Sequence, residues 1–236
     1  MKQKIIRIDL KGVNTYLLKS KNGYILVDAG GPLVLDKGTV DRGTLLEKAL
    51  EKEGCSPHNL HLIILTHGDL DHAFYAPRIK NKYNTKIAIH KNDSYLVNKP
   101  TINDFMNSFK YRSFIYKIVF RLMNSKIYET GIKQLGDFET FSPDILIDDN
   151  FHLSDFGVQG EVLHIPGHTL GSIGILTKDN HLISGDVFAN IKKPEIASNA
   201  HDFKLLSCSV DKLKKIKINK VYPGHGEPFM FDGYCK

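Results

Sequence analysis

The segment Leu65–His72, LTHGDLDH, places two histidines and two aspartates within six consecutive positions, 67 to 72. The apolar run HLIIL at 61–65 leads directly into it. A short apolar run of this kind predicts a buried strand. Rigid scaffolds present their functional groups on loops at strand ends, and imidazole and carboxylate groups bind metals. The segment therefore predicts a fold that gathers strand ends around a metal site.

Three more polar residues occupy the same kind of position. His168 lies in IPGHTLGS, Asp186 in LISGDVF and His225 in VYPGHGEP, each after a short apolar run and directly after a glycine. Glycine lets the backbone turn sharply and approach a site closely. A single Pro-Gly-His is usually only a turn, but the joint order of all the motifs is hard to obtain by chance. The candidate ligands are enough for two metal ions: His67, Asp69, Asp71, His72, His168, Asp186 and His225.

The rest of the chain predicts a β-rich protein with attached helices. Apolar alternation predicts strands within 4–10, 14–20, 23–31, 61–66 and 85–90, and a β-rich second half over 151–186. Helical patterns cover 41–54, 76–83, 101–126 and 203–216. No low-complexity linker divides the chain, so we expect one domain over residues 1–236.

Composition excludes several classes of protein. With 42% hydrophobic and 25% charged residues, the chain has the balance of a soluble globular protein. It has no apolar run long enough for a membrane span and no secretory signal at its start. Three widely spaced cysteines (Cys55, Cys208 and Cys235) do not suggest a disulfide framework, so we expect a cytoplasmic location. We interpret the net charge of +6 as a solvated, lysine-rich surface.

Taken in order, the motifs ILVDAGG, THGDLDH, PGHTLGS, SGD and YPGHG resemble those of the metallo-β-lactamase superfamily over nearly the whole chain. The resemblance implies an α/β fold of the α+β type: an αββα sandwich of two mixed sheets flanked by helices, with metals at one edge. It implies that Asp28 orients the ligands. It assigns the first metal to His67, Asp69 and His168, the second to Asp71, His72 and His225, and the bridge between them to Asp186.

The sequence departs from the family pattern at two positions. Asp69 stands where the family usually has histidine, and Phe74 stands where a glycine is usual. Three carboxylates and a bridging hydroxide carry four negative charges, which balance two divalent ions. A carboxylate is also a harder ligand than imidazole, which favours manganese or iron over zinc. This bias is modest, so we expect two divalent metal ions, with zinc preferred and iron or manganese as alternatives.

A helical insertion is predicted at about residues 100–130. Its apolar residues fall near helical spacing, while Lys110, Lys117 and Arg121 share another face. Three roles remain open for it: a cap packed over the sandwich, a lid that recognises substrate, or a surface for a membrane or partner.

The leading functional hypothesis is a metal-dependent hydrolase of a small-molecule ester, thioester, lactone or phosphoester. Its nucleophile would be a hydroxide activated by two metals, with Asp71 orienting it and accepting its proton. One alternative is a di-iron redox protein, similar to a flavodiiron core without its flavin domain. The other is a nucleic-acid phosphodiesterase, but the basic clamps of such enzymes are not visible, so we do not expect nucleic acid as a partner. His90 and His164 are interpreted as structural histidines, and the oligomeric state is left open.

Overall fold

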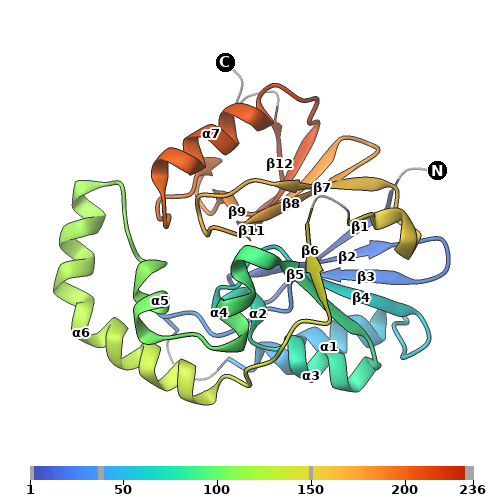
Figure 1. The fold of residues 1–236 in the computed structure, drawn as a ribbon, viewed down its shortest axis with the longest axis horizontal. Coiled ribbons are helices and arrows are strands. Elements are labelled where there is room, and N and C mark those ends of the chain that lie inside the picture. The colour runs from blue at the N-terminus through green and yellow to red at the C-terminus, as the bar shows by residue number, and fades with distance from the viewer. Residues whose placement is uncertain (1–2, 37–39, 149–150, 232–236) are drawn as a thin grey trace.

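The computed structural model describes residues 3–36, 40–148 and 151–231, and it contains two β-sheets that face each other (Figure 1). The first sheet follows chain order, with β1 and β2 antiparallel to their neighbours and β3 to β6 parallel. Its strands are β1 (Ile5–Asp9), β2 (Asn14–Lys19), β3 (Tyr24–Val27), β4 (Leu60–Leu65), β5 (Lys86–His90) and β6 (Ile145–Ile147).

The second sheet has the order β12-β11-β9-β8-β7, with β10 added to β9. Strands β9 and β11 run parallel, and the other pairs are antiparallel, so both sheets are mixed. Its strands are β7 (Gly160–His164), β8 (Ile173–Thr177), β9 (His181–Asn190), β10 (Glu195–Ile196), β11 (Lys220–Gly226) and β12 (Phe229–Met230).

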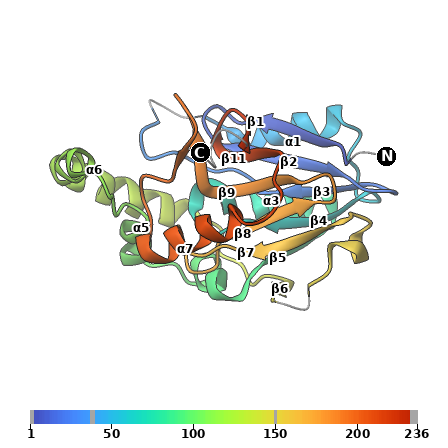
Figure 2. The ribbon, with the colours of Figure 1, turned by 90° about the horizontal axis from the view of Figure 1, so that it is seen from above.

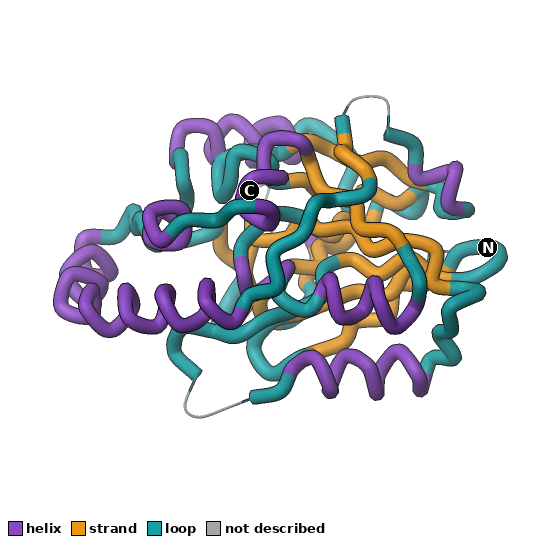
Figure 3. The backbone as a smooth tube through the Cα atoms, turned by 60° about the horizontal axis from the view of Figure 1, so that its bottom comes forward, coloured by secondary structure: helices purple, strands orange, loops and turns teal. Residues whose placement is uncertain are grey.

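Helices cover the outer faces of both sheets, and Figure 3 shows the strands enclosed between them. Helices α1 (Arg42–Lys52) and α3 (Ala76–Tyr83) lie outside the first sheet, and α7 (Phe203–Leu213) lies outside the second. Asp41 begins α1 by accepting a hydrogen bond from the Thr44 amide, as an N-cap residue does. The expected αββα sandwich is confirmed.

The apolar core forms three layers because strand side chains alternate between the two faces of a sheet. In β4, Ile63 and Leu65 pack toward α1 and α3, whereas Leu62 and Ile64 pack between the sheets. All four of these side chains are buried, which is why β4 reads as a continuous apolar run. A third cluster lies between the second sheet and α7.

The helical insertion differs from the expectation in its extent and its surface. It consists of α5 (Ile102–Asn107) and α6 (Phe114–Asp137), and Figure 2 shows α6 at one end of the molecule, beyond α5. Lys110 lies between the two helices and does not share a helical face with Lys117. The solvated side of α6 is also strongly apolar, since Leu122 is 82% exposed. Apolar residues occur on several sides of α6, so the sequence pattern does not show where the helix ends. It ends at Asp137 rather than near Lys126.

The sheet topology gathers strand ends. Because β3, β4 and β5 are parallel, the residues that follow them meet at one edge of the first sheet. In the second sheet, the parallel pair β9 and β11 carries Asp186 and His225. The helices within the described residues include none long and apolar enough to cross a bilayer.

Candidate metal centre

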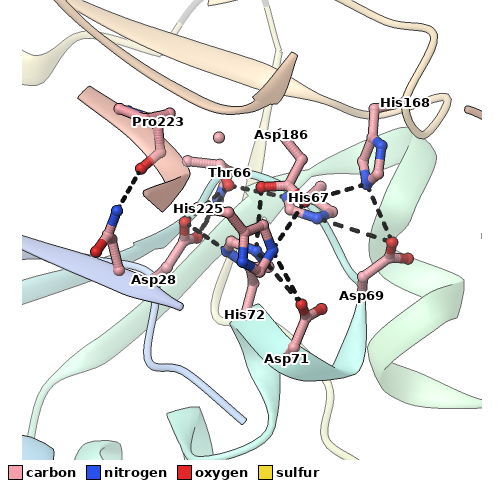
Figure 4. A network of polar contacts seen from close by, with 12 residues as sticks. Asp28, Thr66, His67, Asp69, Asp71, His72, His168, Asp186, Pro223 and His225 are labelled. Atoms are coloured by element: carbon pink, nitrogen blue, oxygen red, sulfur yellow. Dashed lines mark hydrogen bonds and ion pairs between the residues drawn. The ribbon is translucent and has the colours of Figure 1, made fainter. Parts of the chain in front are cut away.

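The predicted ligands lie together where the two sheets meet (Figure 4). Their potential ligand atoms form three groups, and within each group these atoms lie within 4.8 Å of one another. The groups are His67 with Asp69 and His168; His67 with His72 and Asp186; and Asp71 with His72 and His225. The structure thus brings all seven side chains together. The first and third groups have the composition that the resemblance implied for two metal positions.

His67 and His72 are held by hydrogen bonds to the Nδ1 side of their rings. His72 Nδ1 lies 3.0 Å from Asp28 Oδ2, and His67 Nδ1 lies 3.0 Å from Thr66 Oγ1. The Thr66 hydroxyl and amide in turn donate to Asp28. Asp28 therefore fixes both rings, one directly and the other through Thr66.

His168 and His225 are oriented in the same way by backbone carbonyls. His225 Nδ1 lies 2.6 Å from the Gly12 carbonyl, and His168 Nδ1 lies 3.3 Å from that of Asn199. In a neutral imidazole whose Nδ1–H donates, Nε2 is left as the acceptor. All four histidines thus turn Nε2 toward the cluster, which is how metal-binding histidines are oriented in proteins.

Several buried atoms in this cluster have no hydrogen-bond partner of suitable geometry. They are Nε2 of His67, Nε2 of His72 and Oδ1 of Asp186. An unsatisfied buried polar atom costs about 1–3 kcal/mol, so such atoms are rarely left together without a function. A divalent cation would satisfy all three atoms, and the mixed imidazole and carboxylate donors suit zinc, iron or manganese.

The two oxygens of Asp69 face different neighbours. Oδ2 lies 3.2 Å from His168 Nε2, while Oδ1 accepts a 2.8 Å hydrogen bond from the Ser108 hydroxyl. Ser108 follows α5, so Asp69 connects the candidate metal centre to the helical insertion. This contact was not predicted from sequence because Ser108 lies 39 residues away along the chain and belongs to no motif.

The electrostatics of the cluster keep its carboxylates ionised. Burial opposes the ionisation of Asp71, but the neighbouring His72 and His225 outweigh burial and lower its pKa to about 2. Burial likewise acts against the protonation of His225, but Asp186 and Asp71 raise its pKa to about 10. His67 differs, since burial and the positive field of His72 lower its pKa to about 4.

Asp93 braces two of the ligand loops, and sequence analysis missed it. It is fully buried, and its carboxylate accepts hydrogen bonds from the Gly68 amide (3.1 Å), the Thr169 hydroxyl (2.6 Å) and the Gly171 amide (2.6 Å). Gly68 lies between His67 and Asp69, and Thr169 follows His168. The position of Asp93 just after β5, a neighbour of β4, was the signal that could have revealed it.

The loop that carries His225 is anchored through Pro223. Its carbonyl accepts hydrogen bonds from the side-chain amide Nδ2 of Asn14 (2.9 Å) and from the Tyr16 hydroxyl (2.6 Å), both on β2. A Cβ atom on Gly224 would overlap Asp186 Oδ1 and crowd the His72 ring. Glycine is therefore required before His225 because the backbone passes directly against two other ligand candidates.

The residues interpreted as structural, and the second family departure, lie outside the ligand groups. His90 and His164 stack on each other with ring centroids 4.1 Å apart, and His164 also contacts the Leu170 carbonyl. Phe74 packs against Tyr75 and Phe138. Phe74 therefore packs against the core beneath the ligand loop and is not among the residues that line the cavity.

A cavity of about 450 Å³ opens beside the cluster. Asp69, Asp71, His168, Asp186 and His225 form one part of its wall, so the candidate ligands are accessible to a small molecule. The volume is within the range of small-molecule sites.

Known proteins match this chain over most of its length. The family model of the metallo-β-lactamase superfamily matches residues 8–225. The probable metallo-hydrolase MJ0888 of Methanocaldococcus jannaschii is 28% identical over 216 residues, covering 88% of each chain. A β-lactamase-like protein 2 homolog of Caenorhabditis elegans is 23% identical; the match covers 92% of this chain but only 57% of that protein.

Solved structures share the fold. The BLEG-1 B3 metallo-β-lactamase matches with a TM-score of 0.64 at 20% identity, over 97% of this chain and 94% of that one. TTHA1623, in a di-iron-bound form, matches with a TM-score of 0.62 at 19% identity, over 96% and 94%. With the family model spanning nearly every element of the sandwich and all the ligand motifs, the chain belongs to the metallo-β-lactamase superfamily.

Proposed function

We propose that this hydrolase holds two divalent metal ions and cleaves a small ester, thioester, lactone or phosphoester. His67, Asp69 and His168 would hold one ion, Asp71, His72 and His225 the other, and Asp186 both. The observation that supports this most directly is the set of four histidines fixed through Nδ1 with Nε2 turned toward three carboxylates. Zinc is the preferred metal. Iron or manganese is the alternative, because Asp69 replaces an imidazole and the similar fold of TTHA1623 is known with two irons.

The chain's own residues divide the remaining tasks. When bound, divalent ions at such a site acidify water and polarise the substrate oxygen. Asp71 lies at the cavity wall with Oδ2 3.2 Å from His225 Nε2, and its low pKa keeps it ionised at neutral pH. It can therefore orient the attacking water and accept its proton. Asp28 and Thr66 keep the rings of His67 and His72 in place while this happens.

The test combines metal analysis with a substrate panel. Protein purified without added metal would be analysed for zinc, iron and manganese, and the same sample assayed with chromogenic esters, a thioester, a lactone and a phosphodiester. We expect about two metal equivalents and hydrolysis of at least one substrate class. Asp71→Asn should remove most activity while leaving the fold intact. As a matched control, Asp202→Asn changes the N-cap residue of α7, which is not among the candidate ligands, and should leave activity unchanged.

Two results would contradict the proposal. One is a protein that binds no divalent metal. The other is a loaded protein whose activity is unaffected by Asp71→Asn. Iron content together with metal-dependent oxygen consumption, but without hydrolysis, would instead favour the redox alternative.

A further inference from the structure

The cavity beside the candidate metal centre has an apolar wall away from the ligands. Leu33 and Leu35 come from the loop before α1, Leu96 from α4 (Ser94–Asn98), and Phe105 and Leu135 from the helical insertion. These segments are separate in sequence and converge only in the fold. Three separate segments therefore form the apolar part of this cavity, which is called the apolar chamber below.

The helical insertion forms one side of this chamber, and its aromatic residues pack against one another. Phe109 lines the cavity and stacks on Phe120 of α6, with ring centroids 5.1 Å apart. Tyr111 also lines it and packs 4.4 Å from the same ring. Of the roles left open for the insertion, the contacts support a wall of the substrate site, because α6 holds the residues that face the cavity.

Three polar side chains that line the cavity outside the ligands form hydrogen bonds within the protein. Asp104 accepts hydrogen bonds from the Thr101 amide and hydroxyl, and Ser108 donates to Asp69. The Asn199 side chain donates to the Ser108 carbonyl. The exception is Gln134, which lines the cavity and whose buried Oε1 has no hydrogen-bond partner, so one amide group is available to a polar part of the substrate.

The charge of the lining also selects among substrate classes. The chain has 32 lysines and arginines, yet within the described ranges none lines the cavity. Proteins recognise phosphate mainly through arginine and lysine or through rows of backbone amides. A phosphodiester would instead meet four carboxylates, those of Asp69, Asp71, Asp104 and Asp186, with only the metal ions to attract it.

We infer that the substrate is an uncharged carboxylic ester, lactone or thioester whose apolar acyl group occupies this chamber. The inference rests on the proposed hydrolytic function and narrows its substrate class. In the reaction, the oxygen of water forms a bond to the acyl carbon and the carbon–oxygen or carbon–sulfur bond breaks. The leaving group takes up the proton that water loses through Asp71. An acid and an alcohol or thiol are the products.

The length of the substrate's acyl chain gives a direct test. The metal-loaded protein would be assayed with p-nitrophenyl acetate, butyrate, hexanoate, octanoate and decanoate, and with bis-p-nitrophenyl phosphate. A buried methylene contributes about 0.8 kcal/mol, so kcat/KM should rise about fourfold per methylene until the chamber is full. The phosphodiester should be the poorest substrate of the panel.

Two matched variants test whether the dependence on chain length comes from the chamber or from any exposed apolar residue. Leu35 lines the rim of the cavity and is 68% exposed, so Leu35→Asp should fold normally. It should reduce kcat/KM for octanoate at least tenfold more than for acetate. Leu122 is equally apolar and 82% exposed on α6 but does not line the cavity. Leu122→Asp should leave the chain-length profile unchanged.

A binding measurement that needs no metal distinguishes this inference from the proposed hydrolysis. Alkan-2-ones of increasing length should raise the Tm of the metal-free protein progressively, and Leu35→Asp should weaken this effect. If acetate is hydrolysed but neither rate nor Tm depends on chain length, or the phosphodiester is the best substrate, the inference is wrong. If binding depends on chain length but neither an acyl substrate nor the phosphodiester is hydrolysed, the proposed function fails while the apolar site stands.

Discussion

Replacing Asp36 with asparagine should destabilise the protein strongly, although Asp36 lies outside the candidate metal centre. Arg42 is 1% exposed, and its guanidinium contacts both Asp36 oxygens at 2.5 and 2.8 Å. It also donates to the carbonyls of Leu10 and Lys11. Asp36 Oδ2 additionally accepts from the Leu33 amide, so the pair fixes the loop that lines the apolar chamber.

The magnitude follows from what the substitution leaves behind. Breaking a buried ion pair costs about 3–5 kcal/mol, because the remaining charge is buried without its partner. The asparagine carbonyl can still accept one hydrogen bond, so we expect Asp36→Asn to lower the free energy of unfolding by about 2–4 kcal/mol at neutral pH. A comparable change in an exposed pair, Glu227→Gln beside Arg7, should cost less than about 1 kcal/mol.

The same pair predicts a pH dependence. Burial raises the pKa of Asp36, but the Arg42 and Leu33 hydrogen bonds outweigh it, and the folded-state pKa is lowered. A lowered carboxyl pKa gives stability that is present above the unfolded value of about 3.9 and lost as pH falls through the folded pKa. The difference between wild type and Asp36→Asn should therefore shrink below about pH 4.

Urea unfolding of the metal-free proteins, followed by circular dichroism from neutral to acidic pH, measures both effects. A loss below 1 kcal/mol, or a difference that is constant with pH, would refute the reasoning about this ion pair.

Three further changes test the candidate metal centre. Asp69→His removes one carboxylate, so metal content after growth in mixed metals should shift toward zinc; an unchanged metal ratio would show that Asp69 is not a ligand. Asp93→Ala leaves the amides of Gly68 and Gly171 without acceptors, and should cost about 2–3 kcal/mol in urea unfolding and lower metal affinity at least tenfold. Gly224→Ala places a Cβ against Asp186, so isothermal titration should show metal affinity reduced about tenfold or more, and an unchanged affinity would mean that Asp186 is not a ligand.

The sequence predicts the sandwich well where burial is regular. Strand β4 reads as an apolar run because both of its faces are covered, and α3 has the bounds expected from its helical pattern. The short strands β6, β10 and β12 were missed, since two or three residues show no periodicity and pair only because a longer neighbour is present. The segment Leu153–Phe156 forms a 3₁₀ turn rather than part of a strand.

The candidate ligands could be predicted because they belong to short local motifs, in which histidines and aspartates follow an apolar run and the motif contains a glycine. The residues that hold these ligands in place could not be predicted from the sequence. Asp93 and Thr169 lie 76 residues apart, and Asn14 contacts Pro223 across 209 positions. Such contacts depend on which strands become neighbours, and no periodicity within one segment contains that information.

Asp69 connects two features that lie apart in the sequence, the aspartate of the ligand motif and the helical insertion. The sequence reveals the aspartate as a departure from the family and the insertion as an addition to it, but not that they meet. In the structure, one carboxylate oxygen faces His168, and the other accepts from Ser108 at the end of α5. A carboxylate carries two acceptors on a short side chain, so it can face the metal position and the insertion at once. The residues around Ser108 also line the apolar chamber. In the proposed two-metal site, the residue that adjusts the charge would therefore also be the one that contacts the wall of the cavity.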